Sequence, residues 1–250
     1  MSPTTASSRI SKKARKKRRH AGNNEQHSSI VAIRSLPRDL LVEVIASVAS
    51  HSFIDLHNLK KCSKDLLDAT EDNYVWQRVS LETFPLVQWH PNDKKLSFLE
   101  RCKRSKNIES LYREGLREYF NHGKIDGLDT LKAAAQKGHK EAKYVYGMIS
   151  LCSQDDASRK QGLEHMRFLR NSKSVVSSRK KVKFFLGSLW KNATVARNES
   201  PLCNFKNTCQ GWRVKNDKWV LLEEDDDDIS SCKYCRWDHE LNFFYKMLNV

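Results

Sequence analysis

Apolar residues are distributed unevenly along the chain, and their spacing changes twice. Residues 1–30 contain almost none of them and are rich in Ser, Thr, Lys, Arg, Asn and Gln, a composition typical of disordered segments. From residue 35 to about 190, apolar positions recur with helical spacing. Alternation typical of strands first occurs after residue 211, around a candidate turn at Asn216-Asp217. The pattern predicts a mainly α protein with a disordered tail and a small C-terminal β-hairpin.

The first helical block, residues 34–82, is unusually apolar for its size. Pro37 suits the first turn of a helix, and Ser52 is placed to cap a second helix. Two further segments follow, the last of them containing Trp76. Three or four short helices cannot bury all of these apolar side chains, so the block predicts a surface for a partner. The first helix alone places five apolar residues on one stripe: Leu40, Leu41, Val44, Ile45 and Val48.

Small residues recur through the second helical block, residues 95–190. In helix pairs, small residues at contact points let two backbones approach, while larger side chains fill the gaps. Gly138 follows Ala-Ala-Ala-Gln-Lys and suits the position just after a helix end. We therefore expect helix–turn–helix units that stack on their neighbours. The small residues are Gly115, Gly123, Gly127, Ala134, Ala135, Gly138, Ala142 and Gly147.

The positive charge of the chain is concentrated near its N-terminus. The formal net charge is +15, and seven of the positive charges lie between residues 12 and 19, which leaves +8 for the rest. Such a run predicts a nuclear-import signal, with a solubilising tail or an RNA-binding arm as alternatives. We therefore expect a nuclear protein that is also present in the cytoplasm. The basic residues of the run are Lys12, Lys13, Arg15, Lys16, Lys17, Arg18 and Arg19.

No membrane partner is expected from the sequence. No stretch approaches about 18 consecutive apolar residues, the length that a membrane-spanning helix needs. The basic run is not followed by the apolar segment of a secretory signal. Single cysteines within helical patterns also fit a reducing compartment such as the cytosol or nucleus.

Four cysteines in residues 200–250 flank the predicted hairpin. Cys203 and Cys209 precede it, and the pair Cys232 and Cys235 follows it with the two-residue spacing common in zinc sites. Four such ligands would fill a tetrahedral coordination sphere, so we expect one structural zinc, with His239 as a substitute for Cys203. The alternative is a metal-free unit of hairpin and terminal helix with reduced cysteines. Either way, these residues form a small Cys-rich module.

Two stretches of the first block, Ser-Leu-Pro-Arg-Asp-Leu-Leu-Val-Glu-Val-Ile (35–45) and Tyr-Val-Trp-Gln-Arg-Val-Ser-Leu (74–81), resemble an F-box. In that family a Leu-Pro pair opens the first helix and a Trp closes the module. The resemblance implies a three-helix fold that binds a Skp-type adaptor and, through it, a cullin. Leu66 stands where the family usually has Trp. The residues implied to form or support the adaptor-facing surface are Leu36, Pro37, Leu40, Leu41, Ile45, Leu59 and Trp76.

The second block resembles a Sel-like repeat, a relative of the tetratricopeptide helix–turn–helix units. The matching residues run from Gly115-Leu116 through Ala134-Ala135 to Tyr146-Gly147. The order of F-box, single helical repeat and terminal Cys-x-x-Cys-Arg-Trp-Asp-His-Glu resembles a group of plant F-box proteins. In this arrangement the repeat and the Cys-rich module would bind a protein substrate, whose identity the sequence does not specify.

We expect no catalytic residues in this chain. It has no phosphate-binding loop, no Gly-x-Ser-x-Gly and no His-Glu-x-x-His. The resemblance therefore implies a non-catalytic, substrate-recruiting subunit of a Skp-cullin-F-box ubiquitin ligase. The alternative is a nuclear nucleic-acid-binding or scaffold protein that uses the basic tail and the zinc-like module. Four Asp residues at 225–228 would repel phosphate, so we do not expect nucleic acid as the partner.

Overall fold

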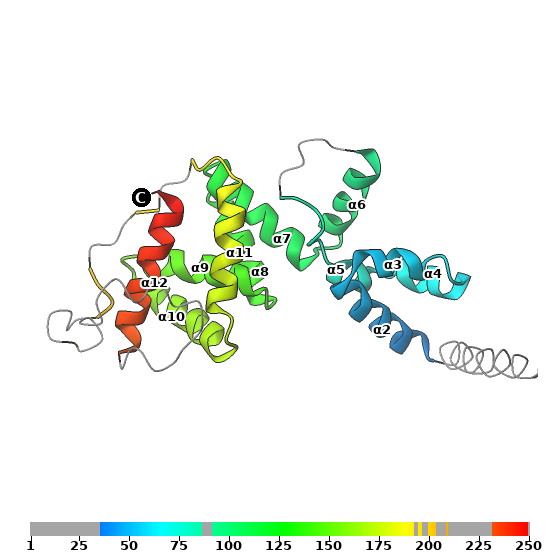
Figure 1. Cartoon of the computed structure of the whole chain (residues 1–250), viewed down its shortest axis with the longest axis horizontal. Helices are drawn as coiled ribbons and strands as arrows, with labels where there is room; N and C mark the ends of the chain where they lie inside the picture. The colour runs from blue at the N-terminus through cyan, green and yellow to red at the C-terminus, as the bar shows by residue number, and fades with distance from the viewer. Residues whose placement is uncertain are drawn as a thin grey trace, which may run out of the picture.

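The computed structural model of the chain describes residues 36–86, 92–192, 195–196, 200–203, 209 and 232–249. Every regular element within these ranges is helical, which confirms a mainly α fold (Figure 1). None of these helices is long and apolar enough to cross a membrane. The predicted hairpin after residue 211 and the basic run at 12–19 lie outside the described residues and remain predictions.

Residues 36–79 form four short helices, in agreement with the four helical segments of the sequence pattern, rather than the three that the F-box resemblance implies. They are α2 (Arg38–His51), α3 (Phe53–Leu59), α4 (Lys64–Thr70) and α5 (Asn73–Arg78). The chain restarts a helix three times because a polar side chain caps each new N-terminus. Ser52 accepts a hydrogen bond from the Asp55 amide, as predicted. Ser63 and Asp72 accept equivalent bonds at α4 and α5, so the segment after residue 63 divides into two helices.

These four helices enclose a core that also includes α6 (Asp93–Arg104). Ile45, Leu56 and Val75 are almost completely buried in it. Phe98 of α6 reaches into the same core, where its ring stacks on Phe84 at a centroid distance of 4.9 Å. We call residues 36–86 together with α6 the N-terminal module. Its core therefore continues past residue 82 into the following helix.

The second part of the molecule is built from antiparallel helix pairs. The elements are α7 (Ile108–Leu116), a π-helical segment (Arg117–Asn121), α8 (Asp126–Gln136), α9 (Lys140–Cys152), α10 (Asp156–Asn171) and α11 (Val175–Gly187). We call them the repeat body. Gly138 has φ +100° and ends α8, as expected for a residue without a Cβ. Tyr112, Leu131 and Tyr144 are completely buried between the pairs.

Glycines allow the closest helix contacts in the repeat body, in agreement with the predicted role of small residues. A Cβ added to Gly127 of α8 would lie 2.4 Å from the Tyr119 amide nitrogen. A Cβ added to Gly162 of α10 would lie 2.8 Å from the Gly147 carbonyl oxygen of α9. In both pairs the obstacle is backbone, which cannot rotate away. The spacing between helices therefore depends on these glycines.

We predict that Gly127→Ala and Gly162→Ala each lower the free energy of unfolding by about 1–3 kcal/mol, because the methyl group overpacks a backbone contact. Gly187→Ala is the matched control, since a Cβ there meets nothing within 4 Å. Its expected change is zero or slightly stabilising, because alanine favours a helix over glycine. Urea unfolding followed by circular dichroism measures all three. Equal stability of Gly127→Ala and Gly187→Ala would contradict this packing.

The C-terminal helix α12 (Lys233–Leu248) packs against α9 and α11 of the repeat body (Figure 1). Its apolar side, including Leu241, Phe244 and Leu248, joins the core of that body. Glu240 of α12 is buried and pairs with Arg179 of α11 through two hydrogen bonds of 2.7 and 2.5 Å. The buried Tyr144 hydroxyl donates to the same carboxylate at 2.6 Å. The Glu240 carboxylate thus connects α12 to both α9 and α11.

Candidate functional site

The N-terminal module carries an exposed apolar face that its own core leaves uncovered. Leu40 and Val44, one turn apart on α2, are 55% and 52% exposed. Ile54 on α3 is 60% exposed and Leu67 on α4 is 40% exposed. Apolar side chains with this exposure, carried by short helices that contact one another, mark an interaction surface. We call these four residues the apolar face.

The seven residues predicted for the partner surface divide into two groups. Leu40 and Pro37 are exposed and Leu36 is half-buried, so they can contact a partner. The other four support the shape of the module: Leu41, Ile45 and Trp76 are buried in its core, and Leu59 is half-buried against it. For the residues of α2, the division follows from the width of the apolar stripe. One edge of the stripe faces the core, and the other edge faces solvent.

The residues predicted for the adaptor-facing surface leave out three residues of the apolar face. Helical spacing placed Val44 on the apolar stripe of the first helix, one turn after Leu40, but the F-box resemblance did not include it. No comparable signal marks Ile54 and Leu67, because their exposure depends on how α3 and α4 pack. Leu66, at the position where the resembling family has Trp, is half-buried against the module core. The next residue, Leu67, is the exposed one of these two leucines.

Trp76 is a buried support of the module. Its ring lies 5.4 Å from that of Phe98, and the Arg101 guanidinium covers it at 3.9 Å. The Lys60 ammonium lies 4.7 Å from the same ring. Both cations are ion-paired with Glu71. Cations over an indole face stabilise it by about 0.5–2 kcal/mol, so Arg101 of α6 and Lys60, just after α3, hold Trp76 in place.

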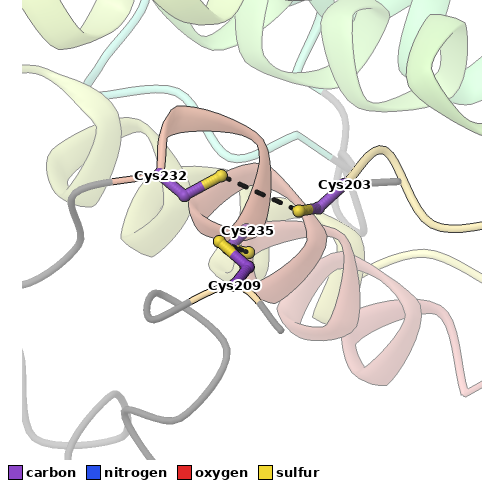
Figure 2. A group of neighbouring side chains, drawn as sticks. All are labelled: Cys203, Cys209, Cys232 and Cys235. Carbon is purple, nitrogen blue, oxygen red and sulfur yellow. Dashed lines mark hydrogen bonds between the residues drawn. The ribbon is translucent and has the colours of Figure 1, made fainter. Parts of the chain in front are cut away.

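The four predicted zinc ligands lie together, although they come from separate parts of the sequence (Figure 2). The Sγ atoms of Cys203 and Cys232 are 3.8 Å apart, and those of Cys209 and Cys235 are 3.6 Å apart. All four sulfur atoms lie within 4.8 Å of one another. In a tetrahedral site with Zn–S bonds of about 2.3 Å, the sulfurs are about 3.8 Å apart. The observed cluster therefore has the dimensions of such a site.

Helix α12 organises this cluster. Cys232 is its N-cap, and Cys235 lies in its first turn. Burial raises the pKa of the Cys232 thiol, but hydrogen bonds from the start of α12 and from neighbouring cysteines outweigh this and lower the pKa to about 7. Burial and hydrogen bonds with the other three cysteines raise the pKa of Cys235. One turn further, the Asp238 carboxylate accepts hydrogen bonds from the Leu202 and Cys203 amides at 2.8 and 3.1 Å. This contact places Cys203 beside the helix. His239 is buried on α12, and the group of four close ligand atoms does not include it.

Comparisons with known proteins follow the same division of the chain. A family model described as plant tetratrico peptide repeats matches residues 81–187. An Arabidopsis thaliana protein named as an F-box protein is 34% identical over 231 residues, which cover 85% of this chain and 77% of the relative. The chain belongs to the F-box proteins. A second A. thaliana F-box protein is 33% identical over 126 residues, which cover 49% of this chain and 76% of the relative. No solved structure gives a significant match.

These findings confirm the prediction of a plant-type F-box protein with a tetratricopeptide-like repeat. The N-terminal module contains the F-box resemblance, and the matched repeat model begins at residue 81, where that resemblance ends. The Cys-rich segment lies beyond the matched repeat.

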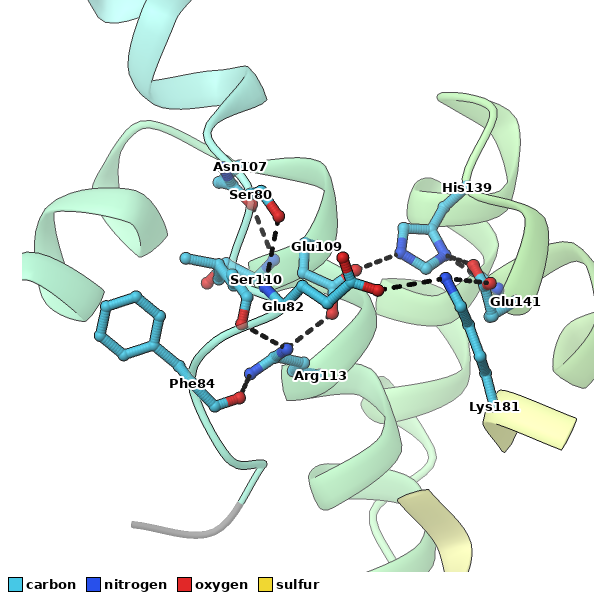
Figure 3. Close-up of polar contacts among 12 residues, drawn as sticks. Ser80, Glu82, Phe84, Asn107, Glu109, Ser110, Arg113, His139, Glu141 and Lys181 are labelled. Atoms are coloured by element: carbon cyan, nitrogen blue, oxygen red, sulfur yellow. Dashed lines mark hydrogen bonds and ion pairs between the residues drawn. The ribbon is translucent and has the colours of Figure 1, made fainter. Parts of the chain in front are cut away.

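Buried polar contacts join the N-terminal module, which contains the F-box and is called the F-box module from here on, to the repeat body (Figure 3). The Asn107 side-chain amide donates to the Trp76 and Val79 carbonyl oxygens at 2.8 and 3.0 Å. The Arg113 guanidinium donates to the Leu81 and Phe84 carbonyl oxygens at 2.8 and 2.7 Å. All four hydrogen bonds are buried. Asn107 and Arg113, at the start of α7 and within it, therefore bind the end of the F-box through its backbone carbonyl groups.

Glu109 holds Arg113 in position and connects it to the next repeat helix. It accepts a hydrogen bond from Arg113 at 2.7 Å and one from His139 Nε2, also at 2.7 Å. His139 Nδ1 in turn accepts the Ala142 amide at the start of α9, so Nε2 carries the proton. Burial raises the pKa of Glu109, but the hydrogen bond from His139 and the charge and hydrogen bond of Arg113 outweigh it and lower the pKa to about 2.

This lowered pKa predicts how the junction responds to acid. A carboxyl group whose pKa is lower in the folded state stabilises the fold above its unfolded pKa, near 4.5, and loses that contribution as pH falls toward 2. Glu109→Gln should therefore be less stable than the wild type at pH 7, and the difference should shrink between pH 4.5 and 2. Urea unfolding at pH 7, 4 and 3 measures this difference. A gap that stays constant with pH would exclude a role for the ionised carboxylate.

Proposed function

We propose that this F-box protein is a non-catalytic, substrate-recruiting subunit of a Skp-cullin-F-box type E3 ubiquitin ligase. The apolar face is the observation that carries the proposal. Its four residues, Leu40, Val44, Ile54 and Leu67, are exposed on the module that gives the family its name. Covering them with a Skp-type adaptor would remove apolar surface from water. The adaptor would then connect the chain to a cullin.

The repeat body would hold the substrate on the other side of the junction. Helices α7–α11 present a surface separate from the apolar face of α2–α4 (Figure 1). The contacts of Asn107 and Arg113 fix the two parts relative to each other through buried backbone carbonyls. A fixed junction would present a bound substrate at a constant position relative to the adaptor. Catalysis would belong to the other subunits.

Co-expression of the full chain with a plant Skp-type adaptor tests this function. We expect the two proteins to elute together in size-exclusion chromatography as a complex with one copy of each. Addition of a cullin should shift that complex to a higher mass only when the adaptor is present. Separate elution of the chain and the adaptor at micromolar concentrations would contradict the proposal.

We further propose that Cys203, Cys209, Cys232 and Cys235 hold one structural zinc. The spacing of their sulfur atoms fits tetrahedral thiolate coordination, and four protein ligands would leave no position for a substrate. The ion would tie residues 203 and 209 to the start of α12. Since α12 belongs to the core of the repeat body, the zinc would stabilise that body rather than take part in a reaction.

Elemental analysis of the purified chain measures the zinc directly. We expect one zinc per chain, and its loss in the double variant Cys232→Ser with Cys235→Ser. Cys62→Ser is the matched control, because Cys62 is an exposed cysteine of the F-box module outside the cluster. It should retain one zinc. A wild-type chain purified without chelators that contains no zinc would contradict this site.

A further inference from the structure

A cleft of about 990 Å³ lies where the F-box module meets the repeat body. Its walls are the linker after α5 (residues 79–85), the first turns of α7 and α9, and the second half of α11. This volume is at the upper end of the range found for ligand-binding pockets. It is large enough for several side chains of an extended peptide. The cleft is separate from the apolar face and from the cysteine cluster.

Aromatic side chains form the α11 wall of this cleft. Phe184 is 74% exposed, and its neighbour Phe185 is half-buried with its ring 5.9 Å from that of Tyr112. Tyr112 is completely buried behind it. An exposed aromatic ring at the edge of a concave site, supported by buried rings, is typical of an anchor for an apolar side chain. Phe184 therefore offers contact area that the chain itself does not use.

Lys180 is a cation close in sequence to Phe184 that a ligand can pair with. Helix α11 carries Arg179, Lys180, Lys181 and Lys183 without an acidic residue. Lys181 lies 3.5 Å from Glu141 and 3.7 Å from Glu82 (Figure 3). Lys180 is exposed, lines the cleft one turn before Phe184, and has no ion pair among the described residues.

The acidic residues of the cleft are already engaged. Glu109 is bound by Arg113 and His139, and Glu141 lies beside His139 and Lys181. Glu82 faces Lys181. An incoming cation would have to compete with these pairs, whereas an incoming carboxylate finds Lys180. Charge complementarity therefore favours an acidic ligand.

The linker that forms one wall of the cleft is held in place by hydrogen bonds within the chain. Residues 79–85 are fixed by the hydrogen bonds from Asn107 and Arg113 to the Val79, Leu81 and Phe84 carbonyl oxygens. A preorganised site loses less conformational entropy on binding. It also places a bound ligand directly against the junction that connects to the adaptor-binding module.

From these observations we propose that this cleft is the substrate-docking site, and that it takes an extended peptide segment in which an acidic side chain is close to a large apolar one. The apolar side chain would lie against Phe184 and Phe185, and the carboxylate would pair with Lys180. This inference rests on the proposed function and adds the chemistry of the substrate. Because each carboxylate of the cleft already faces a cation, a basic peptide fits this cleft less well than an acidic one.

Fluorescence anisotropy with two pools of labelled eight-residue peptides tests the proposal. In one pool an Asp and a Phe are fixed two positions apart, and in the other a Lys replaces the Asp. We expect the full chain to bind the Asp pool at least about tenfold more tightly than the Lys pool. Lys180→Glu should abolish that preference, and Phe184→Ala should weaken Asp-pool binding by about tenfold.

Two substitutions outside the cleft are matched controls. Lys183→Glu makes the same charge change on the same helix, and Phe168→Ala removes another exposed aromatic ring. Neither residue lines the cleft, so both variants should bind the Asp pool as the wild type does. Equal binding of the two pools would overturn the proposal. Equal loss in Lys183→Glu and Lys180→Glu would also overturn it, since it would show general charge attraction.

The acidic run of the chain itself, residues 223–228, is the competing occupant. If replacing its six acidic residues by Ser increases Asp-pool binding tenfold or more, the cleft binds its own chain and the substrate proposal fails. Unchanged binding supports a separate substrate. Adaptor binding measured on the same samples separates this inference from the proposed function. Lys180→Glu should leave adaptor binding intact, whereas a failure of the proposed function would show as no adaptor binding in any variant.

Discussion

The double variant Leu40→Glu with Val44→Glu should bind a Skp-type adaptor at least about a hundredfold more weakly than the wild type. Both side chains are more than half exposed on α2, so neither supports the module core. In the proposed complex they would be covered by the adaptor, and a carboxylate at each position would be buried without a partner. Isothermal titration calorimetry with purified adaptor measures the difference.

Ile125→Glu is the matched control for this variant. Ile125 is another exposed aliphatic residue, but it lies at the start of α8 in the repeat body. Its substitution should leave adaptor affinity within about twofold of the wild type, because surface changes away from an interface have small effects. Thermal melting should show all three proteins folded. Wild-type affinity in the double variant would place the adaptor on some other surface.

Glu240→Gln should destabilise the chain by about 3–5 kcal/mol, the usual effect of removing one partner of a buried ion pair. Gln keeps the size of the side chain but leaves the Arg179 charge without its carboxylate in a largely buried position. The Tyr144 hydroxyl would also lose a charged acceptor. Urea unfolding followed by tryptophan fluorescence measures the change, since Trp237 is buried on α12.

Glu43→Gln provides the comparison for an exposed pair. Glu43 lies 3.4 Å from Arg78 on the surface of the F-box module, where such pairs contribute about 0–1 kcal/mol.

Replacing both Arg179 and Glu240 by Met should recover part of the stability lost in Glu240→Gln, because no buried charge then remains. A stability loss in Glu240→Gln no larger than in Glu43→Gln would mean that the α12 contact is not a major support.

Local sequence signals predicted several features of this fold. The Leu-Pro pair before α2, the cap at Ser52 and the helix-ending Gly138 each depend on nearby residues alone, and the structure agrees with them. The cysteine spacing also selected the four residues that cluster. In each case the chemistry of a short segment limits the conformations available to it.

Features that depend on tertiary packing could not be predicted in this way. The apolar stripe of α2 is wide enough to face both the core and a partner, so the sequence alone did not separate Ile45 from Val44. Glu240 and Arg179 are 61 residues apart, and no local pattern pairs them. The cleft likewise depends on where α11 packs relative to the linker at 79–85. Its lining residues come from separate segments of the chain, so no sequence motif connects them.

Hydrogen–deuterium exchange of the full chain, with and without a Skp-type adaptor, tests the central claim most directly. The account predicts that the adaptor slows exchange in peptides from α2, α3 and α4, which carry the apolar face. Peptides from α7–α11 should exchange at unchanged rates. Protection confined to the repeat body, or no protection in α2–α4 at saturating adaptor, would contradict an adaptor-binding role for this face.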